Sequence, residues 1–171
     1  MEIGLLFNIN KKDVGWFQFG GAFNLVGGEV SGLQIAGLYN NVLDSVEATQ
    51  ITLGYNRVTG SFNGLQIGGL YNNISDSFSG SQISLGHNRI QKSFSGFQLG
   101  GFSNHIKKDF KGIQLSLGYN NIENNFNGFQ AGTFNHTGTT AKGIKLAVIG
   151  NHNWGSTQGF EFAGVSNYSK S

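Results

Sequence analysis

Hydrophobic and polar positions along this chain recur with a period of 16 residues. In the copy GLQIGGLYNNISDSFS, which starts at Gly64, Leu65 and Ile67 flank Gln66, and this alternation predicts a β-strand. The Asn72–Asn73 pair that follows predicts a turn. We therefore expect one strand-and-turn unit in each copy.

Further apolar positions complete the copy. Ile74 follows the asparagine pair alone, and a polar segment then leads to Phe78. Charged residues gather in that polar segment, as at Lys107 and Lys108, so it should face water. Bulky and small residues also swap places between successive copies, as in Gly69-Leu70 and Leu85-Gly86. This alternation predicts that a bulky side chain fills the space beside its neighbour's glycine.

Two polar columns mark the period. Glutamine recurs every 16 residues at Gln18, Gln34, Gln50, Gln66, Gln82, Gln98, Gln114 and Gln130. Asparagine holds one position in eleven copies: Asn8, Asn24, Asn40, Asn56, Asn72, Asn88, Asn104, Asn120, Asn135, Asn151 and Asn167. A one-residue deletion near Thr133 shortens one copy, and Glu2, Lys145 and Glu161 extend the glutamine column. We expect one repeat domain over residues 1–171, regular in 1–130 and degenerate in 131–171, where a C-terminal cap would lie.

A repeat of 16 residues must bury its apolar face against its neighbours. The predicted fold is an all-β solenoid of about eleven coils, in which Ile67, Ile74 and Phe78 point inward and identical side chains stack. The stacked amides would form two structural ladders: Asn40, Asn56, Asn72, Asn88, Asn104 and Asn120 at a corner, and Gln34, Gln50, Gln66, Gln82, Gln98 and Gln114 on a strand face. The alternative is an up-and-down antiparallel β-barrel, in an outer membrane if it spans one, with one strand in each copy.

Composition excludes several classes. Net charge is +2, and no basic run exceeds two residues, so a nucleic-acid partner is not expected. The chain has no cysteine, which excludes disulfides and thiolate metal sites. No apolar stretch predicts a transmembrane helix, and residues 1–13 lack the pattern of a signal peptide. A membrane partner is expected only for the barrel alternative.

Copies such as GLQIAGLYNNV (32–42) and GFQLGGFSNHI (96–106) resemble the GxQIGLxN-type repeats of bacterial surface repeat-containing proteins, notably those of spirochaetes. The resemblance covers essentially the whole chain. It implies a cell-surface or extracellular protein and no established activity. Because residues 1–13 lack the pattern of a signal peptide, we expect this chain to be an excised or mature segment. A more distant resemblance is to the β-roll heads of bacterial adhesins, from which this chain departs by its glutamine column and longer repeat.

Catalytic chemistry is not indicated, and we expect neither an enzyme nor a cofactor. His136 and His152 share one repeat position and would lie on adjacent coils, which makes them weak metal-ligand candidates. The simpler interpretation is that histidine tolerates an exposed turn there. The tyrosine column Tyr39, Tyr55 and Tyr71 is a candidate face for binding glycans.

The leading functional hypothesis is a non-enzymatic structural or adhesive surface scaffold that self-assembles. The first copy, Met1 to Asn8, is as regular as the central ones, so its strand edge should pair with a second copy or another surface protein. The alternatives are an outer-membrane pore, if the chain is a barrel, and a carbohydrate-binding module that uses the tyrosine column.

Overall fold

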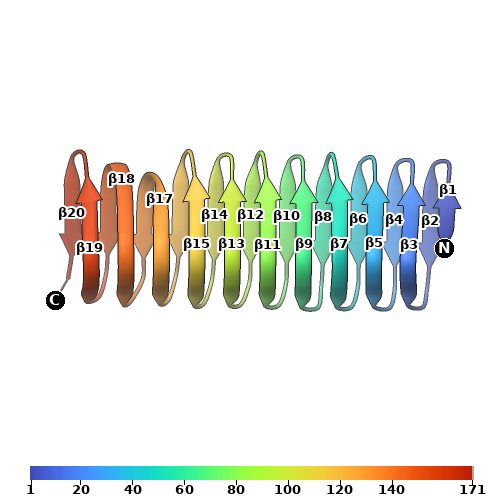
Figure 1. The fold of residues 1–171 in the computed structure, drawn as a ribbon, viewed down its shortest axis with the longest axis horizontal. Helices are drawn as coiled ribbons and strands as arrows, with labels where there is room; N and C mark the ends of the chain where they lie inside the picture. Colours follow the sequence, from blue (N-terminus) through green and yellow to red (C-terminus); the bar gives the residue numbers. More distant parts are fainter. Residues whose placement is uncertain (171) are drawn as a thin grey trace.

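The 16-residue period winds the chain into a β-solenoid of about ten turns, shown here in a computed structural model that describes residues 1–170 (Figure 1). Each strand pairs with the equivalent strand of the next coil, and every pairing is parallel. Gln66 lies opposite Gln82, and Asn72 lies opposite Asn88. The predicted solenoid is therefore confirmed. The antiparallel barrel alternative is wrong, because neighbouring strands of an up-and-down barrel would run in opposite directions.

Most coils contain one long and one short strand. The long strands are β3 (Val14–Gly20), β5 (Val30–Ala36), β7 (Val46–Thr52), β9 (Phe62–Gly68), β11 (Phe78–Ser84), β13 (Phe94–Gly100), β15 (Phe110–Ser116) and β19 (Thr157–Ala163). The short strands are β2 (Phe7–Asn10), β4 (Phe23–Val26), β6 (Tyr39–Val42), β8 (Tyr55–Val58), β10 (Tyr71–Ile74), β12 (His87–Ile90), β14 (Ser103–Ile106), β16 (Tyr119–Ile122) and β20 (Ser166–Ser169). The remaining strands are β1 (Glu2–Gly4), β17 (Phe126–Thr137) and β18 (Ala141–Asn153), of which the last two run through the corner that separates long from short strands elsewhere.

The long strand bends at its third residue, and glycine makes this bend possible. In β11 this residue is Gly80, with a φ of 124°, a backbone angle that other residues rarely adopt. A Cβ atom here would also collide with the carbonyl oxygen of Gly64 in the preceding coil. Trp16 occupies the same position in β3 with a φ of 79°, so its backbone is strained.

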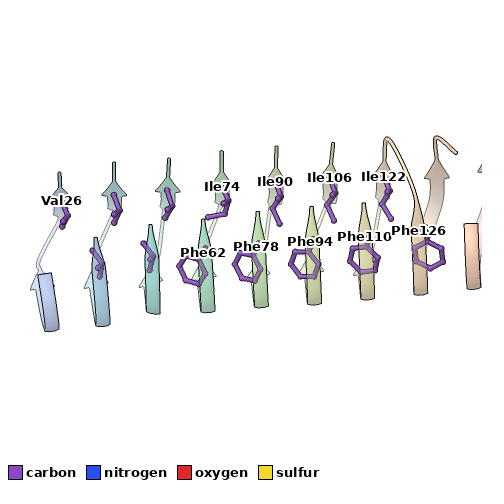
Figure 2. Packing of buried hydrophobic residues seen from close by; sticks show 14 of the residues in the cluster. Val26, Phe62, Ile74, Phe78, Ile90, Phe94, Ile106, Phe110, Ile122 and Phe126 are labelled. Atoms are coloured by element: carbon purple, nitrogen blue, oxygen red, sulfur yellow. The ribbon is translucent and has the colours of Figure 1, made fainter. Parts of the chain in front are cut away.

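The core lies in the lumen of the solenoid (Figure 2). The rings of Phe62, Phe78, Phe94, Phe110 and Phe126 stack on one another, with centroids 4.9 to 5.8 Å apart. A second buried column, from the short strands, consists of Val26, Val42, Val58, Ile74, Ile90, Ile106 and Ile122. The two columns supply the apolar half of the lumen in the regular copies.

The orientation of the long strand differs from the sequence expectation. Gln66 is fully buried in the lumen, whereas Leu65 and Ile67 are half-buried on the outside. The prediction that Ile67 points inward is therefore wrong. Side chains alternate along a strand, so placing the glutamine inside puts both flanking residues outside.

Two further expectations are corrected by the position of the corners. Asn72 and Asn73 lie within β10, so they do not form the predicted turn, and the asparagine column runs along a strand in the lumen. The bulky residues beside the glycines do not fill neighbouring gaps, since Leu70 and Leu85 are 68% and 77% exposed. The glycines are instead required by backbone contact, as a Cβ atom on Gly86 would collide with the Leu70 carbonyl oxygen.

Two isoleucines of one repeat, Ile74 and Ile67, differ in burial. Their replacement by alanine should therefore lower the free energy of unfolding by different amounts. Ile74 is 0% exposed, so Ile74→Ala should lower the free energy of unfolding by about 2–5 kcal/mol. Ile67→Ala removes the same atoms from the half-buried outer face and should cost roughly 1 kcal/mol. Denaturant titration of the two variants measures both values. Equal losses would contradict this assignment of inside and outside.

Candidate functional site

The lumen contains two columns of buried amides in addition to its apolar columns. Asn72 Nδ2 donates to Asn88 Oδ1 at 3.0 Å and to the carbonyl oxygen of Ile83 at 2.7 Å, and the other copies repeat this pair of bonds. Gln66 Nε2 donates to Gln50 Oε1 at 2.8 Å. The asparagine ladder therefore donates toward the C-terminal end, and the glutamine ladder donates toward the N-terminal end.

Charged residues take the glutamine position at both ends of this ladder. At the N-terminal end, the Glu2 carboxylate accepts a hydrogen bond of 2.7 Å from Gln18 and another of 2.7 Å from Asn10. At the other end, Gln130 Oε1 is buried without a hydrogen-bond partner, and Lys145 follows in the column. A carboxylate can only accept hydrogen bonds, and Glu2 lies at the donor end of the ladder. An ammonium group can only donate hydrogen bonds, and Lys145 follows the acceptor end.

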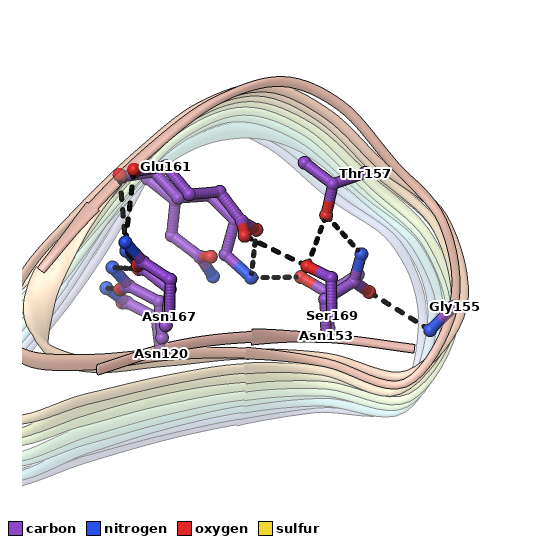
Figure 3. A network of polar contacts seen from close by, with 12 residues as sticks. Asn120, Asn153, Gly155, Thr157, Glu161, Asn167 and Ser169 are labelled. Carbon is purple, nitrogen blue, oxygen red and sulfur yellow. Dashed lines mark hydrogen bonds and ion pairs between the residues drawn. The ribbon is translucent and has the colours of Figure 1, made fainter. Parts of the chain in front are cut away.

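In the last coils, polar side chains such as Asn153 and Thr157 replace the apolar columns (Figure 3). Lys145 is buried in this part of the lumen. Thr137 replaces the isoleucine of the preceding coil and accepts a hydrogen bond of 3.1 Å from Lys145 Nζ. Glu161 Oε1 lies 3.6 Å from the same nitrogen. Burial lowers the pKa of Lys145 to about 8, and the Glu161 carboxylate partly opposes this shift.

The same polar network continues into the last coil. Asn153 Nδ2 donates to Thr157 Oγ1 at 2.9 Å, and Thr157 lies 2.7 Å from the Ser169 hydroxyl, measured between oxygens. Ser169 in turn donates to Glu161 Oε2 at 3.1 Å (Figure 3). The loss of the Ile and Phe columns in residues 131–171 therefore gives a lumen that can solvate an ion pair.

The outer surface carries a continuous apolar side, formed by two strand columns and one corner. The strand columns are Phe17, Leu33, Thr49, Leu65, Ser81, Phe97, Ile113, Phe129, Ile144 and Phe160, and Phe19, Ile35, Ile51, Ile67, Ile83, Leu99, Leu115, Ala131, Leu146 and Phe162. The corner residues are Leu38, Leu53, Leu70, Leu85, Phe102 and Leu117, which are 57–83% exposed. No side chain in these columns or in this corner segment is charged over residues 17–131.

The tyrosine column occupies a wall formed by the short strands. The rings of Tyr39 and Tyr55 are 5.3 Å apart between centroids, and those of Tyr55 and Tyr71 are 5.1 Å apart with planes 7° from parallel. The faces of Tyr55 and Tyr71 thus lie against each other, so a sugar could reach only the ring edges between them. The three rings are half-buried.

His136 and His152 lie side by side, on the outer face of β17 and β18. Their ring centroids are 5.4 Å apart in an edge-to-face arrangement. Burial and the neighbouring His152 lower the pKa of His136. Within residues 1–170, no cluster of three or more His, Cys, Asp and Glu side chains suits a metal ion. Aromatic rings surround this pair instead, and together they line a pocket of about 480 Å³.

A long groove runs over the outside of the phenylalanine strands. Its volume is about 1120 Å³, and serine and asparagine side chains such as Ser61, Asn63, Ser77 and Ser79 form its two edges. Because the phenylalanine between each pair of edge residues points inward, the outer surface is concave there. The groove lies on a different wall from the apolar side.

Comparison with protein-family models, with curated proteins and with solved structures finds no match. In the described part of the chain, residues 1–170, there is no helix that is long and apolar enough to cross a membrane. Functional inference therefore rests on the geometry of the solenoid itself.

The sequence pattern located the stacked columns, but it did not find the apolar side or the aromatic pocket. The column of Ile67 was assigned to the core because this residue is apolar. Two signals in the sequence mark the pocket: Gly150 takes the place of an aromatic residue in its column, and Trp154 follows close to His152.

The depressed pKa of Lys145 predicts a pH-dependent stability. Between about pH 8 and 10.5 the unfolded chain holds a proton that the folded chain has released, so the free energy of unfolding rises with pH. A shift from 10.5 to about 8 is worth up to roughly 3 kcal/mol. Denaturant titration across this range should show a steeper rise for the wild type than for Lys145→Gln/Glu161→Gln, which continues the amide ladder. Exposed Lys142→Gln is the control, and parallel curves for all three proteins would contradict the prediction.

Proposed function

We propose that this β-solenoid is a non-enzymatic structural scaffold that self-associates, with its apolar side packed against the same side of a second copy. The observation that carries the proposal is the apolar side itself. Corner leucines such as Leu53 and Leu117, at 78% and 83% exposure, repeat along its length without an intervening charge. Contiguous apolar surface of this kind is typical of an interaction site.

The size of the apolar side suits a protein partner. About ten turns at ~4.8 Å give a length of roughly 48 Å, and the strand columns with the corner are about 15 Å wide. The product, about 700 Å², is close to the ~800 Å² that each partner buries in a standard interface.

The corner pattern favours a second copy of this chain as that partner. Bulky residues occupy the second corner position at Leu38, Leu70 and Phe102, and the first corner position at Leu53, Leu85 and Leu117. The positions in between are glycines, so the corner is a zigzag of side chains and gaps. A second copy has the same spacing, and with an offset of one coil its side chains would enter these gaps. Location of the protein at the cell surface, which the sequence resemblance implies, stays a prediction.

Charge placed on the corner should prevent association. We expect the wild type to show concentration-dependent sedimentation, and Leu70→Lys/Leu85→Lys to sediment as a monomer at the same concentrations, because a buried unpaired lysine is costly. The matched control is Ser75→Lys/Gln91→Lys, which places two lysines, also one coil apart, in the polar segment that follows the short strands. It should associate like the wild type.

A further variant separates side-by-side from end-to-end contact. Ile3, 61% exposed in β1, lies in the strand edge through which the sequence predicted self-assembly. Loss of association in Ile3→Lys but not in the corner variant would overturn the side-by-side proposal in favour of end-to-end stacking. A wild type that stays monomeric at every concentration would overturn both.

A further inference from the structure

One position in the aromatic column of the short-strand wall has no side chain. After the tyrosines the column continues through His87, Ser103, Tyr119, Phe134, Gly150 and Ser166. At Gly150 the row is interrupted, with the half-exposed Phe134 ring on one side and the Ser166 hydroxyl on the other. A Cβ atom on Gly150 would lie 3.2 Å from Ser166 Oγ, which is a tight contact, and 3.8 Å from the Phe134 ring, so the open space of the pocket lies beyond the Cβ position.

Three aromatic side chains surround this vacancy. The centroid of the His152 ring lies 4.8 Å from that of Trp154 and 4.9 Å from that of Tyr168, and Trp154 and Tyr168 are 6.3 Å apart. Trp154 is 53% exposed and Tyr168 49% exposed, so their rings remain open to a ligand. The pocket that they form with Phe134 has a volume of about 480 Å³, within the range of small-molecule sites.

The size of the vacancy indicates a single ring. Elsewhere in the column, Tyr55 and Tyr71 stack at 5.1 Å between centroids. A flat ring in the place of the missing side chain can therefore pack on Phe134 as one tyrosine packs on the next.

The polar groups of the pocket indicate a neutral, hydroxyl-bearing ligand. Among residues 1–170, His136 and His152 are the only ionisable groups in its lining besides the tyrosines, and the pKa of His136 is lowered by burial and by His152. A neutral imidazole offers one donor and one acceptor, and Trp154 and Ser166 add further donors. A purely aromatic ligand would leave these groups unused, whereas a sugar presents both an apolar ring face and hydroxyls at the ring edge.

We propose that the pocket at Gly150 binds one pyranose ring of a neutral carbohydrate, stacked on Phe134 and hydrogen-bonded at its edge by His152 and Trp154. This site is separate from the apolar side, and it does not require the association proposed above. It is also a different glycan site from the predicted tyrosine column. The faces of Tyr55 and Tyr71 cover each other, whereas the Phe134 ring is half-exposed.

Trp154 fluorescence tests the proposal directly. The chain has two tryptophans, and Trp16→Gly removes the other one while restoring the glycine that this strand position carries in most copies. In this background, titration with methyl glycosides of glucose, galactose, mannose and N-acetylglucosamine should give a saturable change in emission for at least one sugar. Benzyl alcohol has a ring but lacks the set of sugar hydroxyls that His152 and Trp154 would bond. It should therefore bind at least roughly tenfold more weakly, a difference of about 1.4 kcal/mol.

Filling the vacancy provides the decisive variant. Gly150→Tyr should weaken sugar binding by at least roughly tenfold, because the new ring takes the ligand's place beside Phe134. Ser103→Tyr fills another small position of the same column, three coils before Gly150 and not itself in the pocket lining, and should bind sugar like the background protein. Should Gly150→Tyr fail to fold, His152→Ala is expected to give the same loss. No response to any sugar, full binding by a folded Gly150→Tyr or by His152→Ala, or equal binding of benzyl alcohol would overturn the proposal.

Discussion

In the regular copies of this solenoid, the buried amides of both ladders bond to the same amide one coil away. Asn72 and Gln66 are both fully buried, and their side-chain amides bond to equivalents 16 residues later and earlier. A shift of one residue in strand register would place Asn72 opposite His87 or Arg89, and Gln66 opposite Ser81 or Ile83, whose side chains point to the other face. The bonds between equivalent amides would then be lost in both ladders. The ladders therefore fix the register, and the phenylalanine and isoleucine columns stack in the register that the ladders set.

The two ladders run in opposite directions, and this has an electrostatic consequence. Each column of aligned amide bonds has a donor end and an acceptor end, as an α-helix does. Because the asparagine ladder donates toward the C-terminal end and the glutamine ladder toward the N-terminal end, their dipoles oppose each other across the lumen. The charges of Glu2 and Lys145 in the glutamine column complement that ladder at both ends. Lys145 needs the polar neighbours Thr137 and Glu161, which explains why the apolar columns break where they do.

The period and the parallel stacking could be predicted from the sequence because sixteen-residue columns of identical side chains require in-register coils. The assignment of inside and outside could not, since the long strand has apolar residues on both sides of its glutamine. The usual rule that apolar residues face the core favours Leu65 and Ile67 over Gln66. The rule fails here because stacked glutamines satisfy one another in the lumen, which no single copy reveals. The Asn72–Asn73 pair was predicted to form a turn because it is polar. It lies in β10 instead, where Asn72 bonds to the asparagine of the next coil.

The C-terminal copies combine four departures from the regular repeat. The shortened copy is 15 residues long, the separation of Asn120 and Asn135, so β17 runs through the corner with Thr133 in place of the usual two corner residues. The corner leucines end at Leu117, one coil before that change. The lumen then becomes polar around Lys145, and the aromatic column opens at Gly150. The fold tolerates all four departures because the asparagine column continues through Asn135, Asn151 and Asn167 without a break. A continuous asparagine ladder thus keeps the coils in register while residues at other positions vary. A regular repeat can therefore also carry a local binding site.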